Sequence, residues 1–411
     1  MHKLAHPIAL CGALLILAAT AKASEQAFGQ IERGRYLVHA ADCGGCHTQV
    51  EGGQPFAGGR PIETPFGDLV SPNITPDQET GIGAWTDQQF DNAVRRGISP
   101  DGDRLYPAMP YNYYTKMTRA DVMAIRAYLN TVKAVRNSVK SNTLPFPVDI
   151  RAGMRAWDAL FFDAGTFQPD RSKSAEWNRG AYLVTGPGHC GACHTPKNTL
   201  GADEASHAFE GARLQGWFAP NLTNGKTKGL GEWSVDDIAG YLQTGHNRIS
   251  AASGPMAEVV DRSTSHLTAL DAHAIATYLK SLPGDDTPHT AVADNDPAMR
   301  AGQAIYHDQC SACHRLDGKG VDGLFPSLAD SALVRSSDPR TAIRFVLRGA
   351  RSVGTAGAPV ASGMPSFAKQ LTDQEVADVL TYVRNHFGHP APAIATDTVA
   401  DARKQLAARK D

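Results

Sequence analysis

A five-residue pattern, two cysteines separated by two residues and followed at once by a histidine, occurs three times in the chain. The copies are Cys43-Gly44-Gly45-Cys46-His47, Cys190-Gly191-Ala192-Cys193-His194 and Cys310-Ser311-Ala312-Cys313-His314. A cysteine pair alone suits a disulfide, a redox dithiol or half of a zinc site. With the histidine added, two thiols one helical turn apart can bond to the two vinyl groups of one haem while the imidazole faces the iron. The pattern therefore predicts three covalently bound haem c groups, with the six cysteines as attachment sites and His47, His194 and His314 as iron ligands.

The first residues differ from the rest in composition. Lys3 precedes an apolar run from Ile8 to Ala19, and Ala21-Lys22-Ala23 supplies small residues before a cleavage site. This arrangement predicts a signal peptide over residues 1–23 and export to the periplasm. A membrane-spanning anchor would need about 20 apolar residues, more than this run provides. Cleavage also removes Cys11, so that the mature chain keeps no cysteine outside the three motifs.

Each iron also needs a sixth ligand or an open position for chemistry. Met109 and Met364 each lie beside a proline, Pro110 and Pro365, in a segment that precedes an expected helix. Met256 follows His194 by 62 residues, the same separation as that of Met109 from His47. We expect these three methionines to be the sixth ligands, although His246 and His266 compete with Met256. His/Met ligation raises the reduction potential and closes the iron to small ligands, which favours electron transfer over peroxidase or oxygenase chemistry.

Residues around each motif indicate how the haems are supported. Pro72, Pro220 and Pro326 each follow a motif, and their carbonyls are suited to accept the proton on the second nitrogen of the ligand histidine. The alternative is that these prolines only shape turns. Trp85 and Trp233 stand in matched contexts, where an indole N–H can bond a haem propionate or the ring can simply fill the core.

Two further elements repeat around each motif. A glycine in the preceding helical segment, Gly34, Gly180 or Gly302, indicates close approach by another element. Downstream, Thr118, Thr268 and Thr372 each begin an amphipathic segment with a capping signal. We expect this last helix to cross the first one at the glycine.

Together with the motifs, these elements resemble the class I cytochrome c fold, in which the first and last helices pack across each other around one haem. The resemblance implies an all-α protein of three tandem domains, over residues 28–138, 175–284 and 297–388. The apolar connection over 139–174 is expected to pack on the domains, and 285–296 is expected to be an exposed linker. For the polar tail over 389–411 we expect a solvated, frayed helix, with weak docking on anionic lipid as the alternative.

Composition excludes several classes of function. The formal net charge of −2 gives no basic excess, so nucleic acid is not an expected partner. Charged residues make up 20% and apolar residues 42% of the chain, as in ordinary globular proteins. After the signal peptide no stretch is long and apolar enough to span a bilayer, so we expect at most a peripheral membrane contact.

Three phrases extend the resemblance to a more specific family. They are Trp85-Thr86-Asp87-Gln88-Gln89-Phe90, Tyr106-Pro107-Ala108-Met109-Pro110-Tyr111 and Ala274-Ile275-Ala276-Thr277-Tyr278-Leu279-Lys280. They are similar to the triheme cytochrome c subunits of membrane-bound bacterial dehydrogenases, which oxidise alcohols, gluconate, sorbitol, fructose or aldehydes. The resemblance covers nearly the whole mature chain and implies a periplasmic electron-transfer subunit without catalytic activity of its own. Its electrons would come from a quinoprotein, flavoprotein or molybdenum catalytic subunit and pass to ubiquinone or another respiratory acceptor.

Two other functions stay open at this point. One is a stand-alone multihaem electron shuttle that has no dehydrogenase partner. The other is a haem enzyme, which needs an iron with an open sixth position, and only the middle haem, with its less secure methionine, is a candidate.

Overall fold

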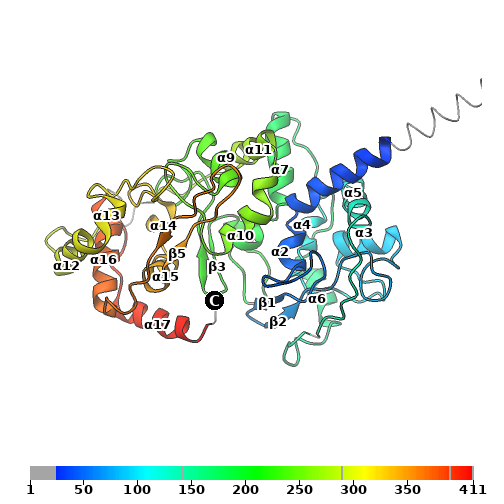
Figure 1. Ribbon diagram of the computed structural model, residues 1–411, viewed down its shortest axis with the longest axis horizontal. Helices are drawn as coiled ribbons and strands as arrows, with labels where there is room; N and C mark the ends of the chain where they lie inside the picture. The colour runs from blue at the N-terminus through cyan, green and yellow to red at the C-terminus, as the bar shows by residue number, and fades with distance from the viewer. Residues whose placement is uncertain (1–24, 141, 288–289, 388–389, 410–411) are drawn as a thin grey trace, which may run out of the picture.

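The computed structural model describes residues 25–140, 142–287, 290–387 and 390–409. The expected signal peptide and Cys11 lie outside these residues. The described chain forms three mostly helical units that follow one another along the long axis of the molecule (Figure 1). We call them unit 1 (residues 25–138), unit 2 (175–284) and unit 3 (297–409).

The elements of each unit follow a similar order. Unit 1 contains a helix over residues 25–40, then α2 (Cys43–His47), β1 (Pro61–Thr64), β2 (Gly67–Val70), α3 (Asp87–Arg96), α4 (Tyr111–Tyr114) and α5 (Arg119–Leu129). Unit 2 contains α7 (Ala175–Thr185), α8 (Gly191–His194), β3 (Ala212–Leu214), β4 (Trp217–Ala219), α9 (Val235–Thr244), α10 (Pro255–Arg262) and α11 (Ala269–Lys280), with short 3₁₀ turns at Ala205–His207 and Thr264–His266. Unit 3 contains α12 (Pro297–Ile305), a π-helical turn (Tyr306–Cys310), α13 (Ser311–His314), α14 (Ala332–Arg335), α15 (Arg340–Arg348), β5 (Ala350–Arg351), β6 (Gly363–Met364), α16 (Asp373–His386) and α17 (Thr396–Ala407).

In every unit the first helix crosses the capped helix α5, α11 or α16 in direct backbone contact. We keep the term last helix for these three, although α17 follows α16 in unit 3. A Cβ atom added at Gly34 would lie 1.8 Å from the carbonyl oxygen of Ala124 in α5. At Gly180 it would lie 1.9 Å from the carbonyl oxygen of Ala274, and at Gly302 2.2 Å from that of Asp378. Because no real Cβ approaches an oxygen so closely, glycine is required at all three crossings. The expectation drawn from the repeated glycines is confirmed.

The last helices begin at the threonines that the sequence indicates, but in two different ways. In unit 3 the Thr372 side chain and Glu375 form a complete capping box. The Thr118 and Thr268 hydroxyls accept only from the backbone N–H of Asp121 and Asp271, at 3.1 and 3.2 Å. The carboxylates of these two aspartates accept instead from an arginine of their own unit and from a tyrosine of the neighbouring unit.

Units 1 and 2 exchange the same contact in both directions. The Tyr36 hydroxyl of unit 1 donates to Asp271 of unit 2, and the Tyr182 hydroxyl of unit 2 donates to Asp121 of unit 1. Arg179 also binds Asp271 through two nitrogens at 2.8 and 2.6 Å. Burial and the bond to Asp271 raise the pKa of Tyr36 to about 12, so its hydroxyl keeps the proton that it donates. The two units are therefore related by a local pseudo-two-fold arrangement, which unit 3 does not share because Ala304 takes the place of the tyrosine.

Each unit also carries a two-stranded antiparallel hairpin, so the prediction of an all-α fold is incomplete. The pairs are β1–β2, β3–β4 and β5–β6. In β3–β4, Leu214 pairs with Trp217 across Gln215 and Gly216, which both have positive φ, at 47° and 76°. A two-residue turn of this kind matches the twist of the strands. The sequence signal was a glutamine in place of the usual asparagine or aspartate before glycine, which made the turn easy to miss.

The connection over 139–174 packs on the units, as expected from its apolar content. It forms α6 (Gly153–Phe161), in which Trp157 is buried and donates its indole N–H to the carbonyl of Leu200 in unit 2 at 3.0 Å. Asp158 accepts from the Tyr111 hydroxyl of unit 1 at 2.7 Å. The connection therefore binds units 1 and 2 together.

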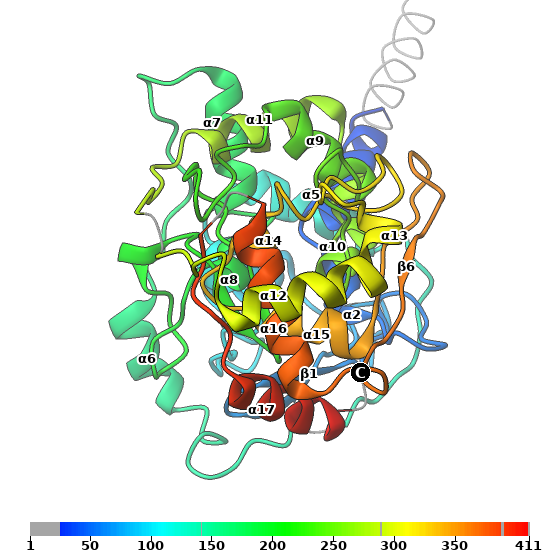
Figure 2. The ribbon, with the colours of Figure 1, turned by 90° about the vertical axis from the view of Figure 1, so that its left-hand side faces the viewer.

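The expectation of a solvated tail after residue 388 is wrong. Its described part forms α17, which lies along α15 and α16 in Figures 1 and 2. Val399 and Leu406 of α17 are buried in the core of unit 3, and Arg403 binds Asp373 at 2.6 Å. The apolar residues at helical spacing in this segment outweigh its many charges. No helix in the described part of the chain is long and apolar enough to cross a membrane.

The crossing geometry leads to a first prediction. Gly34→Ala forces the helix over residues 25–40 away from α5, and overpacking of this kind should lower the free energy of unfolding by at least about 2 kcal/mol. Gly29→Ala is the matched control, since it lies on the same helix with nothing within 4 Å of the added Cβ. It should leave stability unchanged or raise it by up to about 1 kcal/mol. Denaturant unfolding of the purified holoproteins measures both, and equal stability of the two variants would contradict the crossing.

Candidate haem sites

The three motif histidines are held in the same way. Their Nδ1 atoms lie 2.7, 2.6 and 3.1 Å from the carbonyl oxygens of Pro72, Pro220 and Pro326, for His47, His194 and His314 in turn. A carbonyl only accepts, so each Nδ1 carries the proton and each Nε2 presents a lone pair. No other protein group within the described residues hydrogen-bonds these Nε2 atoms. The predicted role of the prolines in orienting the histidines is thus supported by geometry.

Burial suits the histidines to metal ligation. Loss of solvent lowers the pKa of all three imidazoles below the ordinary value, so that they are neutral at pH 7. The neutral imidazole is the form that binds iron, and the proline carbonyl increases its basicity.

The six motif cysteines lie beside these histidines and form no disulfide with one another. Burial raises the pKa of Cys43 and Cys190 to about 12 and that of Cys46 and Cys310 to about 11. A redox dithiol or a zinc site needs thiolates, which these surroundings disfavour. In the described part of the chain no three metal-binding side chains converge on one point. The thiols therefore fit thioether attachment better than the two alternatives.

The methionines occupy three different local settings. Met109 packs against the core of unit 1, and Met364 lies in β6, paired with Ala350, against the core of unit 3. Met256 is the second residue of α10 and is half-buried. The two histidines that compete with Met256 each contact a backbone carbonyl through Nε2. That of His246 lies 2.7 Å from the carbonyl of Val353, and that of His266 lies 3.2 Å from the carbonyl of Asp261.

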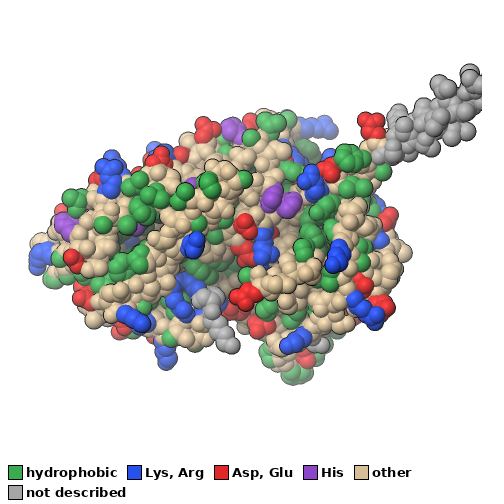
Figure 3. All heavy atoms as spheres, viewed as in Figure 1, with side chains coloured by type: hydrophobic (Ala, Val, Ile, Leu, Met, Phe, Trp, Pro, Cys, Tyr) green, Lys and Arg blue, Asp and Glu red, His purple; other side chains and the backbone are tan. Residues whose placement is uncertain are grey.

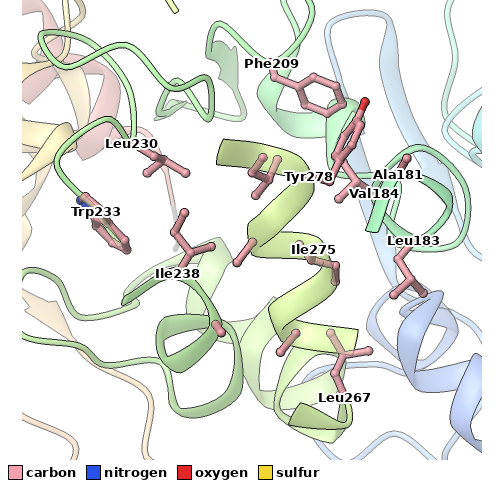
Figure 4. Close-up of a cluster of buried hydrophobic side chains, with 14 of the residues drawn as sticks. Ala181, Leu183, Val184, Phe209, Leu230, Trp233, Ile238, Leu267, Ile275 and Tyr278 are labelled. Carbon is pink, nitrogen blue, oxygen red and sulfur yellow. The ribbon is translucent and has the colours of Figure 1, made fainter. Parts of the chain in front are cut away.

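Trp233 provides a test of whether a haem fits unit 2. Its ring is buried beside Leu230 and Ile238 at one side of the core cluster (Figure 4). Its indole nitrogen is buried and has no hydrogen-bond partner among the described residues. Buried donors are almost always paired, so an acceptor is missing from the chain itself. A haem propionate is an acceptor of the right charge, which agrees with the role predicted for Trp233, whereas the structure gives no such sign for Trp85.

The motif helices of units 1 and 2 are each covered by the other unit. Arg262 at the end of α10 donates to the carbonyl of Gly44 in α2 at 3.1 Å, and Arg60 bonds Gly45 and Glu258. On the other side, the Tyr113 hydroxyl of unit 1 lies 3.0 Å from where a Cβ of Gly191 would be. These contact residues were not predicted from the sequence. The one signal was the glycine at position 191, whose small size is needed because Tyr113 lies against it.

Comparison with known proteins agrees with this geometry. The model of the cytochrome c family matches residues 31–133, 178–283 and 299–387. The chain belongs to the cytochrome c family. Membership implies covalently bound haem c, and the cysteine pairs 43/46, 190/193 and 310/313 fit its Cys-x-x-Cys-His attachment motif.

Curated relatives make the family more specific. The chain is 41% identical to the gluconate 2-dehydrogenase cytochrome c subunit of Pantoea cypripedii, over 91% of this chain and 89% of that protein. It is 40% identical to the cytochrome c subunit of the alcohol dehydrogenase (quinone) of Gluconacetobacter polyoxogenes, over 91% and 83%. It is 38% identical to the fructose dehydrogenase cytochrome subunit of Gluconobacter japonicus, over 91% and 82%. The resemblance to cytochrome c subunits of dehydrogenases is confirmed.

The orphaned indole gives the second prediction. Trp233→Phe keeps an aromatic ring but removes the buried N–H, and loss of a bond to a charged propionate should lower the stability of the holoprotein by about 1.5–3 kcal/mol. Trp177→Phe is the control, because its indole donates to the Ser281 hydroxyl at 2.6 Å in an exposed position. That variant should lose less than about 1 kcal/mol. If Trp233→Phe is as stable as the unmodified protein in denaturant unfolding, the indole does not bond a propionate.

Proposed function

We propose that this cytochrome c is the electron-transfer subunit of a periplasmic dehydrogenase complex. In this proposal three tandem class I domains each hold one covalently bound haem c. His47, His194 and His314, together with Met109, Met256 and Met364, would be the protein ligands of the three irons. The observation that carries the proposal is the motif histidine whose Nδ1 is fixed by a proline carbonyl, repeated in all three units. A haem c so held supplies a one-electron redox centre.

The proposed ligands and the contacts between units suit electron transfer rather than catalysis of a reaction at the iron. Thioethers at all three sixth positions leave no site for peroxide or oxygen. The contacts of Arg262 with the motif of unit 1, and of Tyr113 with that of unit 2, hold two attachment sites next to each other. Electrons pass readily only between centres kept close and in fixed positions, which rigid contacts of this kind provide.

The partner follows from the relatives, whose names place them in gluconate, alcohol and fructose dehydrogenases. We propose a catalytic subunit of quinoprotein, flavoprotein or molybdenum type as electron donor, and ubiquinone or another respiratory acceptor. The complex works in the periplasm, with peripheral attachment to the cell membrane. The face seen in Figure 3 carries charges of both signs interspersed, which agrees with protein partners rather than nucleic acid.

Of the two other functions, the haem enzyme loses support. It requires an open iron in unit 2, whereas we propose that the Met256 thioether occupies that position. The stand-alone shuttle differs from the subunit only in having no bound partner, so purification separates the two.

The haem count is the third prediction. The holoprotein should contain three haems per chain by haemochrome absorbance against protein concentration. The double variant Cys310→Ala, Cys313→Ala should contain two, because each motif binds its haem independently. The matched double variant at Ser311 and Thr372, each changed to Ala, should keep three. A ratio of two in the unmodified chain would show that one motif is not a haem site.

Partnership is tested by the fourth prediction. The chain, tagged at its C-terminus and produced at its natural level, should be recovered from detergent-solubilised membranes together with a larger polypeptide that has dehydrogenase activity. Addition of that polypeptide's substrate should reduce the haem absorption bands of the purified complex. The same tag on an unrelated periplasmic protein is the control. Recovery of the tagged chain alone from the soluble periplasmic fraction would support the shuttle instead.

A further inference from the structure

Two segments that lead to candidate sixth ligands lie against each other across the boundary between units 2 and 3. Residues 244–253 precede Met256, and residues 352–355 belong to the loop between β5 and β6, which ends at Met364. This loop extends from unit 3 toward α9 of unit 2 (Figure 1). The backbone N–H of Val353 donates to the carbonyl of Ala252 at 3.1 Å, and the Thr355 hydroxyl donates to that of Thr244 at 3.0 Å.

The side chain of His246 adds a further bond between the two segments. It is only 8% exposed, and its Nε2 atom donates to the carbonyl of Val353 at 2.7 Å. Its backbone pairs with Ala251 in an isolated bridge, which closes the loop ahead of Met256. Gly245, the C-cap of α9 at a φ of 76°, receives the Val353 side chain where a Cβ would otherwise lie.

Unit 1 closes the corresponding loop without help from a neighbour. There α3 ends at Gly97, which has a φ of 60°, and the next residue, Ile98, forms the bridge with Arg104. The space above Gly97 is filled by the ring of Tyr111 from the same unit. Unit 2 has a histidine where unit 1 has Ile98, and a valine of unit 3 where unit 1 has its own tyrosine. Both loops are closed by a backbone bridge of their own, and in unit 2 the His246 bond and the Val353 side chain add contacts from unit 3.

We propose that His246 is a positioning residue for the middle haem: its hydrogen bond to Val353 holds the loop that presents the Met256 thioether. This rests on the proposed ligation of the middle iron by Met256. The same bond ties that loop to the one that ends at Met364, so the sixth-ligand segments of the second and third haems are fixed to each other. In this role the Nε2 proton of His246 is given to Val353, and the side chain acts on the loop and not as an iron ligand.

The amide isosteres of histidine provide the test. In His246→Gln the side-chain nitrogen reaches the place of Nε2 and can donate to Val353, whereas in His246→Asn it reaches only the place of Nδ1. The readouts are the thioether-to-iron absorption band of the oxidised holoprotein and the midpoint potential of each haem. His246→Asn should lose the middle haem's share of the band and lower one potential, and His246→Gln should retain both.

Controls separate a failure of this proposal from a failure of the ligation on which it rests. Met256→Ala should remove the same share of the band, and adding His246→Asn to it should remove no more. His273→Leu, an exposed histidine of unit 2 bound to Glu176 at 2.6 Å, should leave the band and potentials unchanged. An intact band in Met256→Ala overturns the ligation. A reduced band in Met256→Ala together with an unchanged band and potentials in His246→Asn overturns the positioning role alone.

Discussion

Backbone contact between the first and last helices is the constraint on which the rest of each unit depends. It exists because Gly34, Gly180 and Gly302 remove the one atom that would keep the helices apart. Each motif begins within a few residues of the end of the first helix. In all three units, therefore, the glycine that lacks a Cβ allows the two helices to pack around the site formed by the cysteines, the histidine and the proline carbonyl.

The units differ in the side-chain contacts that they make with one another. Units 1 and 2 exchange equivalent contacts, since Tyr36 reaches Asp271 while Tyr182 reaches Asp121. Those aspartates are free to do so because they do not complete a capping box, whereas Glu375 of unit 3 does. Unit 3 joins unit 2 through other surfaces, including the stacking of Arg344 over the Trp217 ring at 4.0 Å. The third repeat therefore differs from the first two in the surface with which it contacts its neighbour as well as in its sequence.

The sequence was sufficient for features determined within one unit. The motifs, the crossing glycines, the capping threonines and the supporting prolines depend on local spacing, and the structure places each as expected. The hairpins were missed because strands of two to four residues give too short an alternation to detect. The tail was misread because its charges concealed Val399 and Leu406, whose burial depends on α15 and α16. Contacts such as Arg262 with Gly44 have no local signal at all.

The middle unit shows why its sixth ligand was the least secure assignment. Its motif helix is covered by Tyr113 of unit 1, and the loop before Met256 packs against Val353 of unit 3. Residues that in unit 1 belong to a single domain, such as Tyr111 over Gly97, are here supplied by neighbours on both sides. A pattern read within residues 175–284 lacks the part of the site that lies elsewhere in the chain. The middle haem site is therefore the one whose surroundings include residues of both flanking units.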